Sequence, residues 1–527
     1  MDYLKIGKAT ELSGRDRKLY RAFEIFPGAF SLGTLGFLAL LSYLEPVWAA
    51  YVIIAFDVYW LLLVVYLAIY TSVSFRKIKH NQKVDWQDKC QALIQGKYGK
   101  DVAPNALCRQ GVAWSDLWQL VILPTYNESA QIIETALRSV AEDRFPNDHL
   151  IVVLAMEERA GEEAKQRADQ MRERFGPVFP NFLITFHPDG IIGELKGKGA
   201  NQAWAAKEAV RAVIDPRGLD YSRILVSVFD IDTVIPDQYF FALAYKFLTV
   251  DKPHRASYQP IPVYNNNIWQ APFFSRVAAS SNTFWQMIMG IRQEKLVTYS
   301  SHSMTFQALN DIGYWPTNMV SEDSRIFWNC LLYYQGDYRV EPLYLFISMD
   351  ATLDQGILNT AASLYKQQRR WAWGAENLPY LFFNLFRNTR GWSSRGRLIV
   401  AKHILIQIYG FHSWATNALI VGVIGWLPVL LGGERFNSTV LSGNLPQITS
   451  DLMNLAMIGL VLSAIFSNLL LPKRPKGYSP WKSVIMVLQW IFVPVNVTLF
   501  GALPCLDAQI RLMRGKYMGF WVTPKER

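Results

Sequence analysis

Long apolar runs towards both ends of the chain constrain its fold most strongly. Residues 47–70 carry a single charge, Asp57, and exceed the roughly 20 apolar residues that cross a bilayer as a helix. A Glu-Pro pair, typical of a hairpin turn, separates them from a shorter run at residues 28–44. Because a charge is costly at membrane depth, we expect Asp57 to face other helices or a polymer rather than lipid. Further apolar runs follow at residues 403–431, 452–471 and 484–503. The sequence therefore predicts transmembrane helices in residues 28–72 and 401–503.

Basic residues beside these runs indicate which flanks face the cytoplasm. The net charge of +10 is not concentrated in one stripe, which argues against nucleic-acid binding. Instead, basic residues gather next to the apolar runs, as the positive-inside rule expects: Arg15, Arg17, Lys18 and Arg21 before the first, and Arg76, Lys77, Lys79 and Lys83 after the second. We therefore expect a cytosolic N-terminal segment, residues 1–27, without a cleavable signal peptide. Four cysteines without CxxC spacing argue against a zinc site or a disulfide framework and fit a reducing compartment.

The basic C-terminal tail, residues 504–527, conflicts with a simple count of spans. Two spans, a soluble domain and three more spans would leave this tail on the outer side. Its basic residues nevertheless favour the cytoplasm: Arg511, Arg514, Lys516, Lys525 and Arg527. Either the run at 403–431 hides two passes, or the run at 484–503 is a re-entrant pair broken at Pro494.

The middle of the chain, residues 86–375, has the pattern of an α/β domain. Short apolar runs of strand character lie at residues 120–123, 150–155, 182–186 and 224–229, with helical patterns at 130–141, 162–175 and 200–213. This alternation favours βαβ units and a mostly parallel sheet, whose ligands bind beyond the carboxyl ends of the strands. Residues 376–400 follow, rich in Leu, Phe and Tyr and bounded by Arg. We interpret them as an amphipathic helix on the membrane surface, with a core helix as the alternative.

Two aspartates follow the fourth predicted strand. Asp230 and Asp232 are separated by one residue, so local bending of the strand end brings both carboxylates to one site. Such oxygen ligands suit Mg²⁺ or Mn²⁺, which binds one or two carboxylates plus substrate phosphates. The metal would neutralise a departing nucleotide diphosphate. A helix N-cap or an Asx-turn at Asp232 is the structural alternative.

An acidic pair, Glu322 and Asp323, precedes a predicted helix. Asp323 has the chemistry of a general base that takes the proton from an acceptor hydroxyl as that oxygen attacks an anomeric carbon. Direct attack in one step inverts the configuration of that carbon. An aspartate at a helix start is also a common cap, and this residue alone supports both interpretations equally.

Residues 367–371 read Gln-Gln-Arg-Arg-Trp on a predicted helix. Gln367 and Arg370 are three residues apart and share a face. Arg370 can hold phosphate oxygens in a bidentate manner, and the Trp371 indole can stack on a sugar ring. A basic membrane-surface helix with a tryptophan anchor is the alternative. Lys198, in a Gly-Lys-Gly stretch, is a further phosphate-binding candidate, although such stretches are common in loops.

Taken together, these motifs resemble the inverting family 2 glycosyltransferases, and within them the membrane-integrated branch of cellulose, chitin, hyaluronan and mannan synthases. The likeness runs from about residue 120 to the end of the chain. It rests on Pro124-Thr125-Tyr126-Asn127-Glu128 as the nucleotide-binding string, Asp230-Ile231-Asp232 as the DxD string, Ser321-Glu322-Asp323 as the TED string, and Gln367, Arg370 and Trp371 as QxxRW. The ending, Phe520 to Lys525, loosely resembles the FxVTxK string of cellulose synthases, a mobile cytoplasmic gating segment.

The resemblance implies a role for each candidate residue. Asp323 would be the catalytic base, and Asp230 and Asp232 would hold Mg²⁺ or Mn²⁺. The donor nucleotide and its diphosphate would be bound by Thr125, Tyr126, Glu128, Glu157, Lys198, Gln367 and Arg370. The acceptor would be contacted by Trp371, Glu322 and His302, with a buried core histidine as the alternative for His302. Two departures from the family pattern are Glu157-Glu158 in place of aspartates after the second strand, and Ser301-His302-Ser303 in place of the acceptor-site turn of cellulose synthases.

The resemblance also implies an architecture and an activity. We expect an α/β GT-A-type (Rossmann-like) cytosolic domain inserted between N- and C-terminal transmembrane helices. It would transfer a hexose from a UDP-sugar or GDP-mannose to a growing polysaccharide, processively and with secretion of the polymer, and accessory secretion subunits would be further partners. The expected setting is a bacterial inner or plasma membrane, with the catalytic domain facing the cytoplasm. The alternatives are transfer of one sugar to a lipid-linked or glycolipid acceptor, and a transport or scaffold subunit with an inactive domain.

Overall fold

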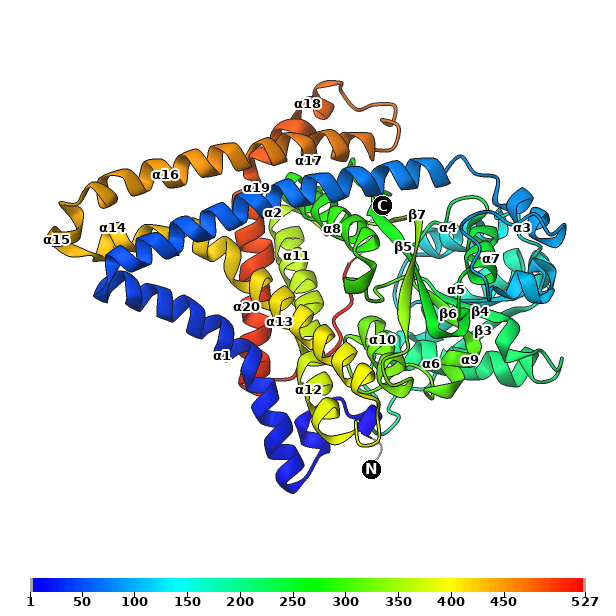
Figure 1. Ribbon diagram of the computed structural model, residues 1–527. Coiled ribbons are helices and arrows are strands. Elements are labelled where there is room, and N and C mark those ends of the chain that lie inside the picture. Colours follow the sequence, from blue (N-terminus) through cyan, green and yellow to red (C-terminus); the bar gives the residue numbers. More distant parts are fainter. Residues whose placement is uncertain (1–2, 525–527) are drawn as a thin grey trace.

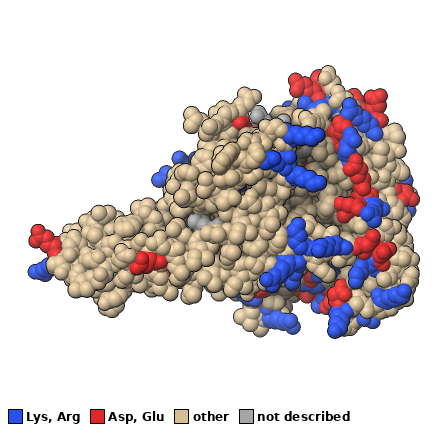
Figure 2. All heavy atoms as spheres, turned by 90° about the horizontal axis from the view of Figure 1, so that it is seen from above, with Lys and Arg blue, Asp and Glu red and all other residues tan. Residues whose placement is uncertain are grey.

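The computed structural model describes residues 3–524, which form a broad part and a narrow part (Figure 1). A mixed sheet with its flanking helices forms the broad part, and long helices extend from it to α15 (Gly433–Asn437) at the narrow end. Figure 2 shows Lys, Arg, Asp and Glu gathered over the broad part, whereas the narrow part presents mainly uncharged atoms in that view. The charged and the apolar surfaces therefore belong to different parts of the molecule.

Seven strands form one sheet in the order β3-β2-β1-β4-β6-β5-β7. They are β1 (Trp118–Pro124), β2 (Leu150–Glu157), β3 (Phe182–His187), β4 (Ile224–Val228), β5 (Ala256–Tyr264), β6 (Ser303–Thr305) and β7 (Arg339–Met349). β1 is parallel to β2 and β4, and β2 is parallel to β3, so the predicted parallel strands are confirmed. β6 is antiparallel to β4 and β5, which makes the sheet mixed, and β5 is parallel to β7.

Helices cover both faces of this sheet. They are α3 (Trp86–Ile94), α4 (Ala130–Ala141), α5 (Gly161–Phe175), α6 (Lys198–Ala209), α7 (Tyr239–Thr249), α8 (Phe273–Ile291), α9 (Phe306–Asp311) and α10 (Glu322–Tyr333). On β1, Leu120 belongs to the core under α6 and α10, and Val121 to the core under α4 and α7. Successive side chains of a strand point to opposite faces, so a strand buried on both faces reads as a continuous apolar run. The predicted helices at 130–141, 162–175 and 200–213 are confirmed, the last continuing α6 through a π-helical turn, Val210–Ile214.

Five helical segments in the described part of the chain are long and apolar enough to cross a membrane. They are α1 (Gly14–Leu44), α2 (Pro46–Asn81), α13 (Ser394–Gly422), the pair α16 (Val440–Ala456) and α17 (Ile458–Leu469), and the last segment, Trp481–Met513. The short helix α14 (Leu427–Leu431) continues the path of α13 towards α15. On α2, Asp57 is buried, and its carboxylate accepts a hydrogen bond from Thr449 Oγ1 at 2.9 Å. The expectation that Asp57 faces another helix is therefore confirmed.

The last apolar segment is interrupted near its middle. It consists of α18 (Trp481–Leu488), α19 (Val493–Val497) and α20 (Leu503–Met513), joined by a 3-10 turn, Gln489–Phe492, and a π-helical turn, Thr498–Ala502. Pro494 has no amide hydrogen to donate, which favours a break at this point. On one side of the break, Arg276 Nε from α8 donates to Gln489 Oε1 at 2.7 Å. On the other, α20 packs on α1 and on α11 (Ile357–Ala372). Figure 1 shows this segment crossing the base of the helical bundle rather than extending to its narrow end.

Segments near the two ends of the chain meet at Glu24 on α1. Glu24 is buried, and its Oε1 accepts a hydrogen bond from the Ala9 amide at 3.0 Å. The Tyr517 hydroxyl donates to Glu24 Oε2 at 2.9 Å. Arg21, one turn earlier on the same helix, donates to the Leu512 carbonyl oxygen at 2.8 Å. The N-terminal segment and the C-terminal tail therefore lie on the same side of the helical bundle.

The predicted amphipathic segment at 376–400 contains α12 (Asn377–Arg387), which packs against α1, α10 and α13. Leu378, Tyr380 and Phe383 are buried in these contacts, whereas Phe386 is exposed. Most residues of α12 are buried, on more than one face of the helix, as the core-helix alternative expects. Its location at a membrane surface stays a prediction.

Candidate active site

The carboxyl edge of the parallel strands brings together the candidate residues. β4 ends just before Asp230. β5 and β7 run in the same direction as β4, so Tyr264 and Asp350 reach the same edge. β6 runs the opposite way, and the residues that precede it, including Ser300, therefore approach this edge as well. α6 begins at the edge with Lys198, whose ammonium contacts Asp230.

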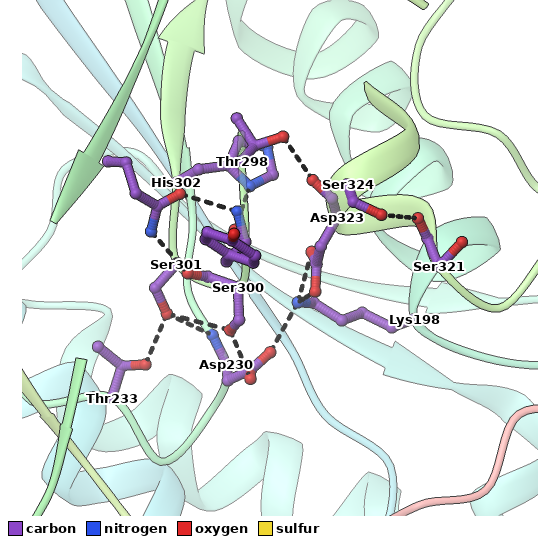
Figure 3. Close-up of polar contacts among 12 residues, drawn as sticks. Lys198, Asp230, Thr233, Thr298, Ser300, Ser301, His302, Ser321, Asp323 and Ser324 are labelled. Carbon is purple, nitrogen blue, oxygen red and sulfur yellow. Dashed lines mark hydrogen bonds and ion pairs between the residues drawn. The ribbon is translucent and has the colours of Figure 1, made fainter. Parts of the chain in front are cut away.

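Lys198 lies between two acidic groups from different elements (Figure 3). Its Nζ is 2.7 Å from Asp230 Oδ1 and 2.9 and 3.0 Å from the two carboxylate oxygens of Asp323. The Lys198 side chain is only 10% exposed. Asp323 is the second residue of α10, and Ser321 takes the N-cap position. The structure therefore directs the Asp323 carboxylate to Lys198, and the helix-cap alternative for Asp323 does not hold.

Burial and neighbouring charges set the protonation of this cluster. Burial disfavours the charged form of Lys198, but the carboxylates of Asp230 and Asp323 outweigh it and raise the pKa of Lys198 above its ordinary range. Burial, reinforced by the adjacent Asp323, raises the pKa of Glu322 to about 8. At pH 7 the cluster therefore contains a charged Lys198 and a neutral Glu322.

Asp230 and Asp232 are held by different partners. Ser300 Oγ donates to Asp230 Oδ2 at 2.6 Å, whereas Lys198 lies closest to the other carboxylate oxygen, Oδ1. Asp232 is buried, and its Oδ2 accepts a hydrogen bond from the Asp350 amide at 3.0 Å. This bond ties the loop after β4 to the end of β7, so Asp232 is not a helix cap.

The chemistry of these groups fits a divalent metal. Asp230 already accepts a cation, the Lys198 ammonium, and carboxylate oxygens are the ligands that Mg²⁺ and Mn²⁺ prefer. Among residues 3–524, no group of three or more His, Cys, Asp or Glu side chains is arranged to hold a metal ion. A metal at Asp230 and Asp232 would therefore need further oxygen ligands from a substrate or from water, as Mg²⁺ sites usually do.

The loop after β1 and the end of β2 form the opposite side of the edge. Thr125 Oγ1 and the Tyr126 amide both donate to Glu128 Oε2 at 2.8 Å, so Glu128 fixes the conformation of this loop. Arg159 Nε donates to Glu157 Oε2 at 2.5 Å, and the Arg159 guanidinium lies over the Tyr126 ring at 4.2 Å. A cleft opens beside this group and is lined in part by Glu157, Arg159, His187, Asp189 and Glu194.

The motif at residues 367–371 lies on α11, as its helical pattern predicts. Gln367 Oε1 accepts a hydrogen bond from Thr352 Oγ1 at 2.7 Å. The Trp371 ring lies 6.0 Å from the ring of Tyr264, at the end of β5. Burial, reinforced by the charges of Asp230 and Asp232, raises the pKa of the Tyr264 hydroxyl. Tyr264 thus links the tryptophan to the site.

The C-terminal tail covers part of this region. The Phe520 ring lies 5.1 Å from the Arg370 guanidinium. At Gly197, where φ is +152°, an added Cβ would come within 2.7 Å of the Phe520 ring, so a larger residue at 197 would displace the tail. Of the residues predicted for the tail, Lys525 and Arg527 lie outside the described residues.

His302 is buried next to the cluster. Its Nδ1 is 2.9 Å from the Tyr299 carbonyl oxygen, an acceptor, so Nδ1 carries the hydrogen. Nε2 is then an acceptor, and it has no hydrogen-bond partner within residues 3–524. Burial lowers the pKa of His302, which keeps the ring neutral at pH 7. The buried core histidine that the sequence offered as an alternative is therefore what the structure contains, with one buried acceptor atom left unpaired among the described residues.

A family model described as Glycosyl transferase family group 2 matches residues 225–504, just over half of the chain. The chain belongs to this family. The predicted resemblance is thereby confirmed at the level of the family 2 glycosyltransferases, while the membrane-integrated synthase branch stays a prediction.

Comparisons with solved and curated proteins complete these findings. The mannosyltransferase PcManGT from Pyrobaculum calidifontis, solved with GDP-Man and Mn²⁺, is 16% identical and has a TM-score of 0.40, covering 75% of this chain and 99% of its own. Residues 1–349 of S. aureus TarS, solved with UDP-GlcNAc, are 16% identical with a TM-score of 0.34, covering 66% of this chain and 90% of their own. No curated protein matches the chain.

In this family 2 glycosyltransferase, the buried Glu376 supports the string Ser321–Asp323. Glu376 Oε1 accepts hydrogen bonds from the Ser321 amide at 3.1 Å and from the Ser321 hydroxyl at 2.7 Å. Its Oε2 accepts from Trp373 Nε1 at 2.8 Å. Burial raises the pKa of Glu376, and the charge of Arg325 opposes this shift. Glu376 thereby fixes the start of α10 and the position of Asp323.

Replacing Glu376 with alanine should therefore destabilise the protein. We expect a loss of about 1–3 kcal/mol, because the buried donors of Ser321 and Trp373 lose their acceptor. Thermal melting of the purified protein measures this change. Glu173→Ala, on the exposed surface of α5, is the matched control and should leave the melting temperature unchanged. Equal melting of Glu376→Ala and wild type would contradict the supporting role.

Glu322 makes a pH-dependent contribution to stability. Its pKa in the folded protein, about 8, lies above its ordinary value of 4.5, so between these values the folded state binds more protons than the unfolded chain. Stability therefore falls as pH rises through this window, by up to about 1.4 kcal/mol per pH unit. Glu322→Gln cannot ionise, so its melting temperature relative to wild type should be higher at pH 8 than at pH 5. A difference that does not vary with pH, as expected for the exposed control Glu173→Gln, would contradict this assignment.

Sequence reasoning missed residues that act by supporting the predicted ones. Ser300 and Glu376 carry no motif, and only their contacts with Asp230 and Ser321 reveal them. Arg159 follows the predicted Glu157 by two residues, so its proximity to the second strand end was a usable signal. Lys198 was predicted as a phosphate ligand, and its contact with Asp323 had no signal in the sequence.

Proposed function

We propose that this protein transfers a hexose from a nucleoside-diphosphate sugar to an acceptor hydroxyl, with inversion at the anomeric carbon. The observation that carries the proposal is the convergence of Lys198, Asp230 and Asp323 at the carboxyl edge of the sheet in a family 2 glycosyltransferase. This cluster combines a cation for phosphate, a carboxylate for metal and a carboxylate for a proton. Such a combination is what nucleotide-sugar transfer needs.

Asp323 acts as the general base. Its carboxylate takes the proton of the acceptor hydroxyl while that oxygen forms its bond to the anomeric carbon. The bond between this carbon and the diphosphate oxygen breaks in the same step, and the nucleoside diphosphate leaves. Because attack and departure occur on opposite faces of the sugar, the configuration inverts. A general base must first lie within hydrogen-bond reach of the proton that it takes, and its pKa matters second. Glu376 fixes the position of Asp323 by accepting a hydrogen bond from Ser321.

Asp230 and Asp232 are the residues that would hold Mg²⁺ or Mn²⁺. A divalent metal there would supply positive charge that stabilises the departing diphosphate. Ser300 orients Asp230, and the Asp350 amide orients Asp232. These outer contacts set the directions in which the two carboxylates offer their oxygens.

The donor is bound from both sides of the edge. The loop with Thr125, Tyr126 and Glu128 and the carboxylate of Glu157 are proposed to hold the nucleoside, in the cleft that Arg159 borders. The remaining groups are proposed to hold the diphosphate: Lys198, Gln367 and Arg370. Arg370 lies beside Phe520, so the tail is proposed to order over a bound donor.

The acceptor approaches the same carboxylate. We propose that the Trp371 indole stacks on a sugar ring of the acceptor, as its contact with Tyr264 at the site supports. The available Nε2 of His302 would accept a hydrogen bond from an acceptor hydroxyl. Glu322, neutral at pH 7, can donate a hydrogen bond without adding a negative charge beside Asp323.

We propose an integral membrane protein with its catalytic domain in the cytoplasm. Five long apolar helical segments support the membrane location, and the basic residues beside them are the argument for the orientation. We propose that α1, α2, α13 and the pair α16–α17 cross the bilayer, whereas the interrupted segment Trp481–Met513 lies at its cytoplasmic side. An even number of crossings returns the tail to the side of the N-terminal segment, in agreement with the contact between Tyr517 and Glu24. This accounts for a basic tail after five apolar segments. Cysteine substitutions at exposed tail positions should react with membrane-impermeant reagents only in inside-out vesicles.

The helices on both flanks of the domain favour a growing polysaccharide as the acceptor, with outward transfer of the product. Product size tests this part of the proposal. Purified protein with the active donor and Mg²⁺ or Mn²⁺ should yield a high-mass product that remains bound to the enzyme when unlabelled donor is added in a chase. A single lipid-extractable product would instead indicate addition of one sugar to a lipid or glycolipid.

A further inference from the structure

The contact between Lys198 and Asp230 has a consequence for metal binding. Asp230 is a proposed metal ligand, yet one of its oxygens, Oδ1, lies 2.7 Å from the Lys198 ammonium, and the other accepts the Ser300 hydroxyl (Figure 3). Both oxygens therefore have partners before a metal arrives. A lysine ammonium and a divalent cation repel each other, and at 4 Å even an exposed pair of unit charges interacts with about 1 kcal/mol. The two cations consequently compete for the same carboxylate.

The same ammonium also occupies Asp323. Lys198 Nζ lies within hydrogen-bond distance of both carboxylate oxygens of Asp323, at 2.9 and 3.0 Å. A base in this arrangement has no oxygen oriented only towards an acceptor hydroxyl. Lys198 thus joins the metal ligand and the base into one closed, largely buried group.

Lys198 is able to change partners. It is the first residue of α6, and its flexible side chain bears a compact charge with three donors. A donor diphosphate offers this ammonium several anionic oxygens near the site. Once Lys198 bonds to the diphosphate, Asp230 and Asp323 lose their shared cation and become available to metal and acceptor.

We propose that Lys198 is an internal counter-ion that excludes the divalent metal from Asp230 until a nucleoside diphosphate binds. Metal and donor then enter as a coupled pair, and the base is released in the same event. The proposal rests on the proposed function, because it takes Asp230 as a metal ligand. Coupling between two ligands is reciprocal, so the nucleotide must raise the affinity for metal by the factor by which metal raises the affinity for the nucleotide.

Mn²⁺ binding to the full-length purified protein tests this directly. Free Mn²⁺ is measured by electron paramagnetic resonance without nucleotide, for wild type and for Lys198→Met. The variant removes the competing cation and should bind Mn²⁺ roughly 5–150-fold more tightly than wild type, the usual range of such coupling. Lys196→Met removes an equal charge two residues away, from a partly exposed ion pair with Asp189, and should leave the affinity unchanged.

Two further measurements keep the test decisive. Lys198→Arg retains the cation and should keep the weak Mn²⁺ binding of wild type, and thermal melting establishes that each variant is folded. With the wild-type protein alone, addition of UDP or GDP should lower the concentration of free Mn²⁺ by more than the same nucleotide lowers it in the absence of protein. Unchanged or weaker Mn²⁺ binding in a folded Lys198→Met, or no effect of either nucleotide on wild type, would overturn the proposal. If Mn²⁺-dependent donor turnover by wild type persists in that case, the proposed function stands and only the role of Lys198 falls.

Discussion

Asp323→Asn should lower the turnover of donor by roughly 10²–10⁴-fold, the usual contribution of a general base. Asparagine has nearly the shape of aspartate but cannot take a proton from the acceptor hydroxyl. Its side-chain oxygen can still accept a hydrogen bond from Lys198, which contacts both oxygens of Asp323 in the wild type. Donor and metal should therefore still bind, and the loss should be confined to the chemical step. Nucleotide release at saturating donor measures this effect.

The matched control is Asp337→Asn, which neutralises an exposed aspartate paired with Lys252 at 3.0 Å. It should retain wild-type turnover. Near-normal turnover in a folded Asp323→Asn, with donor binding intact, would remove Asp323 from the role of base. The melting temperatures of both variants accompany the kinetics and establish that each variant is folded.

Asp230→Asn should lower metal-dependent turnover by roughly 10³-fold. Metal stabilisation of a departing group is worth several kcal/mol, and each 1.4 kcal/mol corresponds to a factor of ten in rate. An amide is a weaker ligand than a carboxylate, so the Mn²⁺ concentration for half-maximal activity should also rise. The Ser300 hydroxyl can still donate to the asparagine side-chain oxygen, which preserves the local loop.

A titration of activity against Mn²⁺ distinguishes this effect from a structural one. Asp237→Asn, which removes an exposed carboxylate paired with Arg144 at 3.0 Å, should have the metal dependence of wild type. If Asp230→Asn retained the wild-type Mn²⁺ requirement, Asp230 would not be a metal ligand.

The strands β1, β2 and β4 were predictable because they are buried on both faces. Residues such as Leu120 and Val121 face different cores, so the whole strand is apolar and stands out in the sequence. β5 and β7 escaped prediction because Pro260, Pro262 and Pro342 interrupt their apolar runs, and β6 escaped it because only three residues, Ser303–Thr305, form it. Its antiparallel direction is nevertheless what brings Ser300 to the site.

The residues of the candidate site that belong to sequence motifs were predictable. The contacts between residues far apart in the sequence were not. Asp230 and Asp323 lie 93 residues apart, and their shared contact with Lys198 depends on how α6 and α10 both begin at one edge of the sheet. The sequence left cap and base equally plausible for Asp323. The structure excludes the cap alternative, because Ser321 occupies the cap position and the Asp323 side chain points to Lys198.

The course of the last apolar segment also depended on tertiary contacts. Its composition is that of a spanning helix, and Pro494 indicated only where it breaks. What keeps the tail beside the N-terminal segment is the pairing of Tyr517 with the buried Glu24. Neither residue belongs to a recognisable pattern.

The most direct test of the central claim is nucleotide release by the purified, detergent-solubilised protein, measured separately with UDP-glucose, UDP-GlcNAc and GDP-mannose in the presence of Mg²⁺ or Mn²⁺. The account predicts release with one of these donors, dependence on the metal, and loss of that release in Asp323→Asn. Metal-dependent release that Asp323→Asn leaves intact, or no release with any of the three donors although the nucleotide binds, would contradict it.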